Sequence, residues 1–125
     1  FYSGVFEMDV LFRETTPAFS HAILRSGPSS WLHPAALAGN AHGSALPEMF
    51  ARGHLDHLAL GAPSQAAFAI IRERLMARGA SSGLVEDLGA MHALWFEDPD
   101  GMKGEVCLIV DPELRSFHAP RPLEA

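Results

Sequence analysis

One glutamate, Glu105, stands near the start of a strand-like run, GEVCLIV (104–110), whose other residues are mostly apolar. Successive side chains of a strand point to opposite faces. Glu105 therefore shares a face with Cys107, whereas Val106 and Leu108 form the other face, which is aliphatic and predicted to pack under a helix. A carboxylate on an otherwise apolar strand is costly unless it is paired, hydrogen-bonded or bound to a metal ion.

A histidine, His57, occupies a comparable place in GHLDHLALGA (53–62). His57 and Ala59 point one way and Leu58 the other, which is typical of a half-buried strand. Imidazole and carboxylate together suit Zn, Mn, Ni, Co or Fe(II). We therefore predict that His57 and Glu105 bind a divalent metal ion. The alternative is that Glu105 is exposed or paired with an arginine and that His57 is simply hydrogen-bonded.

The elements that must position these two residues follow the order strand, helix, then two or three strands. The segment 63–80 is predicted to be a helix, because Pro63 and Ser64 favour a helix start and Gly79 a stop. The runs that follow it predict a short extended piece near 84–88, a strand over 92–98, a turn at DPDG (98–101) and a last strand over 104–110.

The first half of the chain repeats this pattern without its opening. The runs 5–13, 19–26 and 29–37 are predicted strands, Phe1 and Tyr2 would close a helix, and the Gly-, Asn- and Pro-containing segment 38–52 would connect the halves. The chain starts within an apolar pattern and without a methionine. Either an opening strand and most of a helix precede Phe1 in the natural protein, or the chain lacks the metal ligand that such a strand would supply and binds metal weakly or not at all.

Composition narrows the class of protein. The chain has 125 residues, of which 48% are hydrophobic and 19% charged, which favours one globular domain. A formal charge of −6 with a single lysine, Lys103, argues against a nucleic-acid partner. No apolar run is long enough to span a membrane, and one cysteine excludes an internal disulfide. We expect a cytoplasmic protein.

Taken together, GHLDHLAL, the amphipathic helix, ARGA and WFEDPDGMKGEV resemble one module of the vicinal oxygen chelate superfamily. This superfamily includes glyoxalase I, bleomycin-resistance proteins, fosfomycin-resistance thiol transferases and extradiol dioxygenases. The resemblance covers residues 53–110 well and 1–37 more loosely. It implies an α+β fold in which paired βαβββ modules form an open, cup-shaped mixed sheet. The chain would be a single domain with an incomplete first module (1–37), a connector (38–52), a second module (53–110) and a C-terminal arm (111–125).

The resemblance also implies a site. His57 matches the first-strand histidine of the second module and Glu105 its last-strand glutamate, both metal ligands pointing into the cup. A further family ligand comes from the first strand of the first module, which has no counterpart here. His33, in the last strand of that module, is the candidate substitute, although Pro34 disturbs its geometry. His92, at a strand end, is the candidate catalytic residue.

Two functions remain open. The first is a metal-dependent enzyme, dioxygenase-like or lyase- or transferase-like, in which the ion acts as Lewis acid on vicinal oxygens of a small molecule. Glyoxalase I itself is disfavoured, because no glutamate ends the first module near Trp31 and His33. The second is a metal-free protein that sequesters a small molecule, as bleomycin-resistance proteins do, with Trp31, Trp95 and Phe96 as aromatic walls. Cys107 is a further candidate for the pocket. We favour the enzyme, because His57 and Glu105 both stand at matching places, and the resemblance implies a homodimer.

Overall fold

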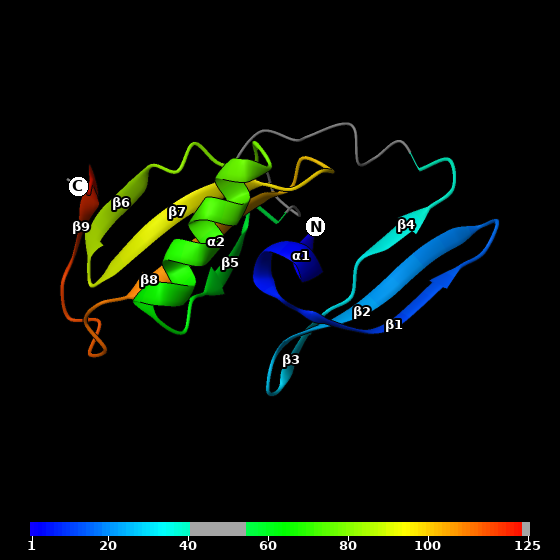
Figure 1. Cartoon of the computed structure of the whole chain (residues 1–125), viewed down its shortest axis with the longest axis horizontal. Coiled ribbons are helices and arrows are strands. Elements are labelled where there is room, and N and C mark those ends of the chain that lie inside the picture. The colour runs from blue at the N-terminus through cyan, green and yellow to red at the C-terminus, as the bar shows by residue number, and fades with distance from the viewer. Residues whose placement is uncertain (41–54, 124–125) are drawn as a thin grey trace. The chain divides into compact units, whose positions relative to one another are not determined.

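The computed structural model describes residues 1–40 and 55–123. The chain divides into two compact units, Phe1–Leu46 (unit 1) and Pro47–Ala125 (unit 2), and Figure 1 shows the elements of each. Most of the predicted connector, 38–52, lies outside the described residues. The predicted α+β class, with strands grouped in two modules that each contain a helix, is confirmed.

Unit 1 is a short helix followed by an antiparallel sheet. Its elements are α1 (Tyr2–Phe6), β1 (Asp9–Thr15), β2 (Phe19–Gly27), β3 (Ser30–Leu32) and β4 (Ala35–Leu37). The long strand β2 is central: β1 pairs along one edge, and β3 and β4 pair in turn along the other.

Two boundaries of unit 1 differ from the prediction. The strand expected over 5–13 begins only at Asp9, because Val5 and Phe6 belong to α1, which ends at Glu7 in a left-handed conformation (φ 56°). The strand expected over 29–37 is divided into β3 and β4, which flank His33 and Pro34. A proline has no N–H to donate to a neighbouring strand, which accounts for the break.

Unit 2 contains the remaining elements: β5 (Leu58–Gly61), α2 (Gln65–Ala77), β6 (Val85–Gly89), β7 (Met91–Glu97), β8 (Lys103–Ile109) and β9 (Phe117–Pro122). The strand order is β5-β8-β7-β6-β9, with β5 and β8 parallel and the other neighbours antiparallel. This is the βαβββ order predicted for the second half. The tail adds β9, which pairs with β6 at the edge of the sheet.

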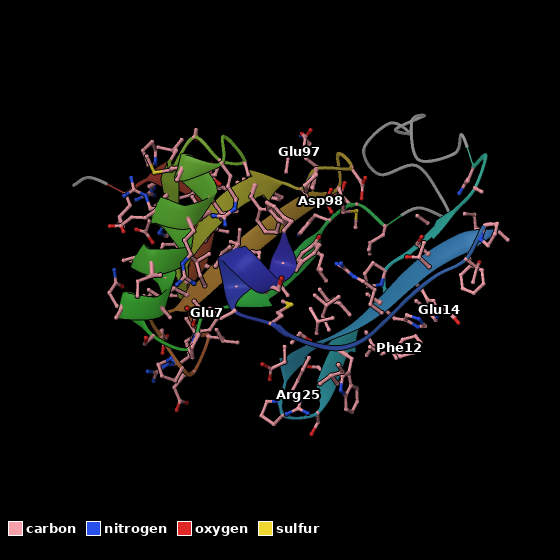
Figure 2. All side chains as sticks on the ribbon, turned by 45° about the vertical axis from the view of Figure 1, so that its right-hand side comes forward. Glu7, Phe12, Glu14, Arg25, Glu97 and Asp98 are labelled. Carbon is pink, nitrogen blue, oxygen red and sulfur yellow. The ribbon has the colours of Figure 1, made fainter. Side chains whose placement is uncertain are left out.

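Local signals set the ends of the unit 2 elements. Ser64 caps α2, because its Oγ accepts a hydrogen bond from the Ala67 N–H at 3.1 Å, as helix starts favour. The turn between β7 and β8 is fastened by Asp98, whose Oδ1 accepts hydrogen bonds from the backbone N–H groups of Asp100 and Met102, both at 2.9 Å. Figure 2 shows Glu97 and Asp98 together at this end of β7.

The core of unit 2 lies between α2 and one face of the sheet. Figure 1 shows α2 lying across the strands, and it packs against β8. The buried apolar side chains on the two sides are Phe68, Leu75, Leu94, Phe96, Val106 and Leu108. The predicted aliphatic face of β8 is therefore buried at Val106 and Leu108, which leaves Glu105 and Cys107 on the opposite face.

The Phe96 ring lies closely against β8 at Gly104. A Cβ atom added at Gly104 would stand 2.1 Å from the Phe96 ring, whereas one added at Gly61, in the neighbouring strand β5, would meet nothing within 4 Å. The Phe96 ring is buried, so it cannot turn out into solvent without exposing its apolar surface. We expect Gly104→Ala to lower the free energy of unfolding by about 1–3 kcal/mol, the usual cost of overpacking.

Gly61→Ala is the matched control, and it should leave stability nearly unchanged. Urea unfolding followed by tryptophan fluorescence measures both variants. Equal stability of Gly104→Ala and wild type would show that the Phe96 ring does not confine β8.

Candidate functional site

The structure brings His57 and Glu105 together on one face of the unit 2 sheet. Ala59 is directly opposite Glu105 in the parallel β5–β8 pair. His57 precedes Ala59 by two residues, so its side chain lies on the same face. The His57 Nε2 and Glu105 Oε2 atoms are 3.3 Å apart. Residues separated by almost fifty positions in the chain thus form one polar pair.

Glu105 is the buried member of this pair. It is 7% exposed and is the one buried charged residue in the described part of the chain. Its neighbour Cys107, two residues on, shares its face and forms a side-chain hydrogen bond with it. Burial, and then the charge and hydrogen bond of Glu105, raise the pKa of the Cys107 thiol from an ordinary 9.0 to about 12. Cys107 is therefore a neutral thiol that donates its hydrogen bond to the carboxylate.

Asp56 holds the other side of the His57 ring, and the sequence analysis missed it. The Asp56 Oδ2 atom lies 2.7 Å from His57 Nδ1. A carboxylate on one imidazole nitrogen fixes the ring and leaves the other nitrogen to bind a ligand, as commonly seen around metal-bound histidines. The signal was present in the sequence LDHL, where the carboxylate directly precedes the histidine.

Trp95 adds an aromatic surface next to the pair. It lies opposite Glu105 in the β7–β8 register, and its ring meets the His57 ring edge-on with centroids 4.9 Å apart. Its Nε1–H donates a hydrogen bond to Glu86 Oε2 at 3.1 Å, so the position of the indole is fixed. Trp95 remains 39% exposed, which leaves the indole accessible to a ligand. Glu86, on β6, was not identified from the sequence.

His92 is not brought to this face. In β7 it alternates with Ala93 and Trp95, so it points to the opposite side of the sheet from Glu105. Its Nδ1 atom is buried and has no hydrogen-bond partner among the residues that the structure describes. The predicted catalytic residue therefore does not join the His57–Glu105 pair.

The two remaining predicted residues belong to unit 1. Trp31, in β3, lies opposite Arg25 of β2 and is 57% exposed. His33 stands between β3 and β4, with its Nε2 atom 2.9 Å from His21 Nδ1. Within residues 1–40 and 55–123, no three His, Cys, Asp or Glu side chains come together in a geometry that could hold a metal ion. The same residues contain no helix with both the length and the apolar character needed to cross a bilayer.

Several solved structures share this fold. A glyoxylase/bleomycin resistance protein/dioxygenase domain from Frankia sp. EAN1pec superposes with a TM-score of 0.69 at 24% identity, over 89% of this chain and 80% of that one. The protein SMU.1112c gives a TM-score of 0.57 at 22% identity, over 85% of this chain and 84% of that one. A protein from the mobile metagenome of V. pseudocholerae gives a TM-score of 0.50 at 18% identity, over 86% of this chain and 79% of that one.

No family model matches the chain, and no curated protein matches it. The structural neighbours nevertheless show its fold. The chain has the fold of a glyoxylase/bleomycin resistance protein/dioxygenase domain, and the resemblance stated from the sequence is confirmed at the level of fold.

The raised pKa of Cys107 gives the first test of the site. At pH 8 the thiolate fraction of Cys107 should be about a thousandfold lower than that of a thiol with a pKa of 9.0. Because the thiolate is the reactive form, the rate of Cys107 alkylation should rise about tenfold per pH unit. We therefore expect slow alkylation by iodoacetamide in the folded chain and ordinary rates in urea.

Glu105→Gln separates the effect of the Glu105 charge on the Cys107 thiol from the effect of limited access of iodoacetamide to that thiol. It removes the negative charge and keeps the side-chain size, so the Cys107 pKa should fall and alkylation should accelerate at constant pH. An unchanged rate in this variant would mean that Glu105 does not act on the thiol.

Proposed function

We propose that this chain binds a small molecule against the His57–Glu105 face of unit 2, and that these two side chains hold a divalent metal ion there. The single observation that carries the proposal is the 3.3 Å separation of His57 Nε2 and Glu105 Oε2. Two ligand atoms that are each about 2.0–2.1 Å from one ion stand about 2.9–3.4 Å apart at the angles of common coordination geometries. The pair therefore fits two adjacent positions on one ion.

The surroundings support the same proposal. Asp56 would accept the Nδ1–H of His57 and so keep the Nε2 lone pair directed at the ion. Cys107 is a neutral thiol, so it adds no charge of its own beside Glu105. A nitrogen and a carboxylate oxygen together suit Fe, Mn, Zn, Ni or Co, the ions that the sequence indicated.

The proposed substrate is a small molecule with two neighbouring oxygen atoms. A bound divalent ion supplies Lewis-acid polarisation of such oxygens. The chain itself would position the molecule: Trp95 offers an aromatic surface beside His57, and the Glu86 carboxylate fixes that indole. Dioxygenase-like and lyase- or transferase-like reactions are the classes that use this arrangement.

A second candidate, metal-free binding of a small molecule, is favoured by one specific observation. His57 already contacts Asp56 and Glu105 directly, at 2.7 and 3.3 Å, so both ring nitrogens have partners without a metal ion. In that case the face would act as an aromatic and acidic surface, in which Trp95 and Glu86 would attract a cationic ligand.

Metal content distinguishes the two candidates. Chain purified without added chelator or metal should contain about one ion of Fe, Mn, Zn, Ni or Co, measured by elemental analysis. His57→Ala and Glu105→Ala should each lose it while keeping the circular dichroism spectrum of the fold. His118→Ala and Glu113→Ala, which remove the same residue types from positions of unit 2 outside the pair, serve as controls; Glu113 is exposed and His118 half-buried.

The outcomes are distinct. Retention of a stoichiometric ion in Glu105→Ala would refute the assignment of that ligand. Absence of tightly bound metal from wild type, before and after incubation with each ion, would leave metal-free binding as the function, to be pursued by a ligand screen.

Asp56 gives a separate test. Asp56→Asn keeps the shape of the side chain but removes its charge, so the His57 ring is held less firmly in the metal-binding tautomer. We expect metal affinity to fall about 10–100-fold, as it does when such outer partners of metal ligands are lost. Calorimetric titration with the ion found in wild type measures this, and an affinity equal to that of wild type would rule out a role for Asp56.

A further inference from the structure

A second set of metal-capable side chains lies on one face of the unit 1 sheet, and the proposed function does not use it. His21 Nδ1 and His33 Nε2 are 2.9 Å apart, and His21 Nε2 is 3.0 Å from Glu14 Oε2. The three side chains form a row in which His21 is the middle member. Of the three, the sequence analysis had identified His33 alone.

Strand pairing fixes the row. Glu14 of β1 is directly opposite His21 of β2, and residues directly opposite in an antiparallel pair share a face. On its other side His21 pairs with Ala35 of β4, two residues beyond His33. The Ala22 N–H donates a hydrogen bond to the Pro34 carbonyl at 3.1 Å, which ties the segment around His33 to β2. Both histidines are thus held by backbone pairing, which makes their spacing a property of the sheet.

Aromatic contacts hold the middle ring in place. The His21 ring lies 5.2 Å from the Phe12 ring and 5.0 Å from the Phe19 ring, centroid to centroid. Figure 2 shows Phe12 and Glu14 near each other along β1. The His21 side chain is 19% exposed and that of Glu14 is 48% exposed, so an ion can reach the row from solvent.

The Glu14 contact decides how His21 presents its nitrogens. A carboxylate only accepts hydrogen bonds, so His21 Nε2 carries the proton and donates it to Glu14. The Nδ1 lone pair of a neutral His21 must then point to His33. In the absence of a metal, the His33 Nε2–H donates to that lone pair. A metal ion would replace this proton, and His33 would carry its proton on Nδ1 instead.

We propose that His21 Nδ1 and His33 Nε2 together bind a divalent transition-metal ion such as Zn²⁺ or Cu²⁺, with Glu14 orienting His21 and water filling the other positions. Two nitrogen ligands of one ion stand about 2.9–3.4 Å apart, and the observed 2.9 Å is at the short end of that range. Imidazole nitrogens favour Cu²⁺, Ni²⁺ and Zn²⁺ over Mg²⁺ and Ca²⁺. Carboxylate, histidine and metal in a row is a common arrangement at protein metal sites.

The site has two protein ligands rather than three, so it should bind an exchangeable ion. Its structural effect follows from the two segments that it joins. His21 lies within β2, whereas His33 lies at the break between β3 and β4, where Pro34 interrupts the sheet. A bound ion would cross-link the break to β2 and stabilise unit 1.

The test uses the full chain with the unit 2 pair removed. In the His57→Ala/Glu105→Ala background, calorimetric titration with ZnCl₂ should still show about one equivalent of binding. Adding His21→Ala or His33→Ala should abolish it, and adding Glu14→Gln should weaken it about 10–100-fold. Adding His118→Ala, at a half-buried position of unit 2, should leave the titration unchanged.

A second readout guards against variants that fail to fold. In the same folded background, long-range ¹H–¹⁵N spectra of the histidine rings should show the Nε2–H form of His21 before Zn²⁺ is added. On addition, the His21 and His33 ring signals should shift and the His118 signals should not. Absence of Zn²⁺ and Cu²⁺ binding in this background, or binding that persists without both His21 and His33, would overturn the proposal. Either result leaves the assignment of His57 and Glu105 unaffected, because the background lacks both.

Discussion

The pairing of β5 with β8 is the constraint on which the unit 2 site depends. These strands are parallel neighbours although α2, β6 and β7 intervene in the chain, and their register sets Ala59 against Glu105. A slip of one residue would turn Glu105 toward α2 and its buried side chains. The contacts of His57 with Glu105 and with Trp95 rely on that alignment, and the α2 packing that buries Val106 and Leu108 keeps it in place.

A buried carboxylate, Glu105, is the centre of this face. Glu105 is surrounded by a neutral thiol, an indole and a histidine whose other nitrogen is already held by Asp56. Burial strengthens electrostatic interactions because little water screens them. Both candidate functions of unit 2 follow from this: a metal ion or a cationic ligand would neutralise the same charge. The fold does not choose between them, since one architecture supports many chemistries.

In each unit a carboxylate contacts one ring nitrogen of a histidine. Asp56 contacts one nitrogen of His57, and Glu14 contacts one nitrogen of His21, so in each case a carboxylate directs the opposite nitrogen at a second group. The settings differ in burial. In unit 2 the second group is the nearly enclosed Glu105, whereas in unit 1 it is His33 on an open sheet face. The first arrangement suits a retained ligand and the second an exchangeable one.

The sequence by itself determined the order of elements and the facing of side chains. Ser64 and Gly79 indicated the two ends of α2, and DPDG indicated the turn between β7 and β8. The two-residue period of a strand placed Glu105 and Val106 on different faces of β8. Only the tertiary structure decided which strands are neighbours and in what register. That decision brought His57 to Glu105, Glu86 to Trp95 and His21 to His33. The physical reason is that periodicity is a local property of the backbone, whereas a side-chain contact depends on how distant strands align.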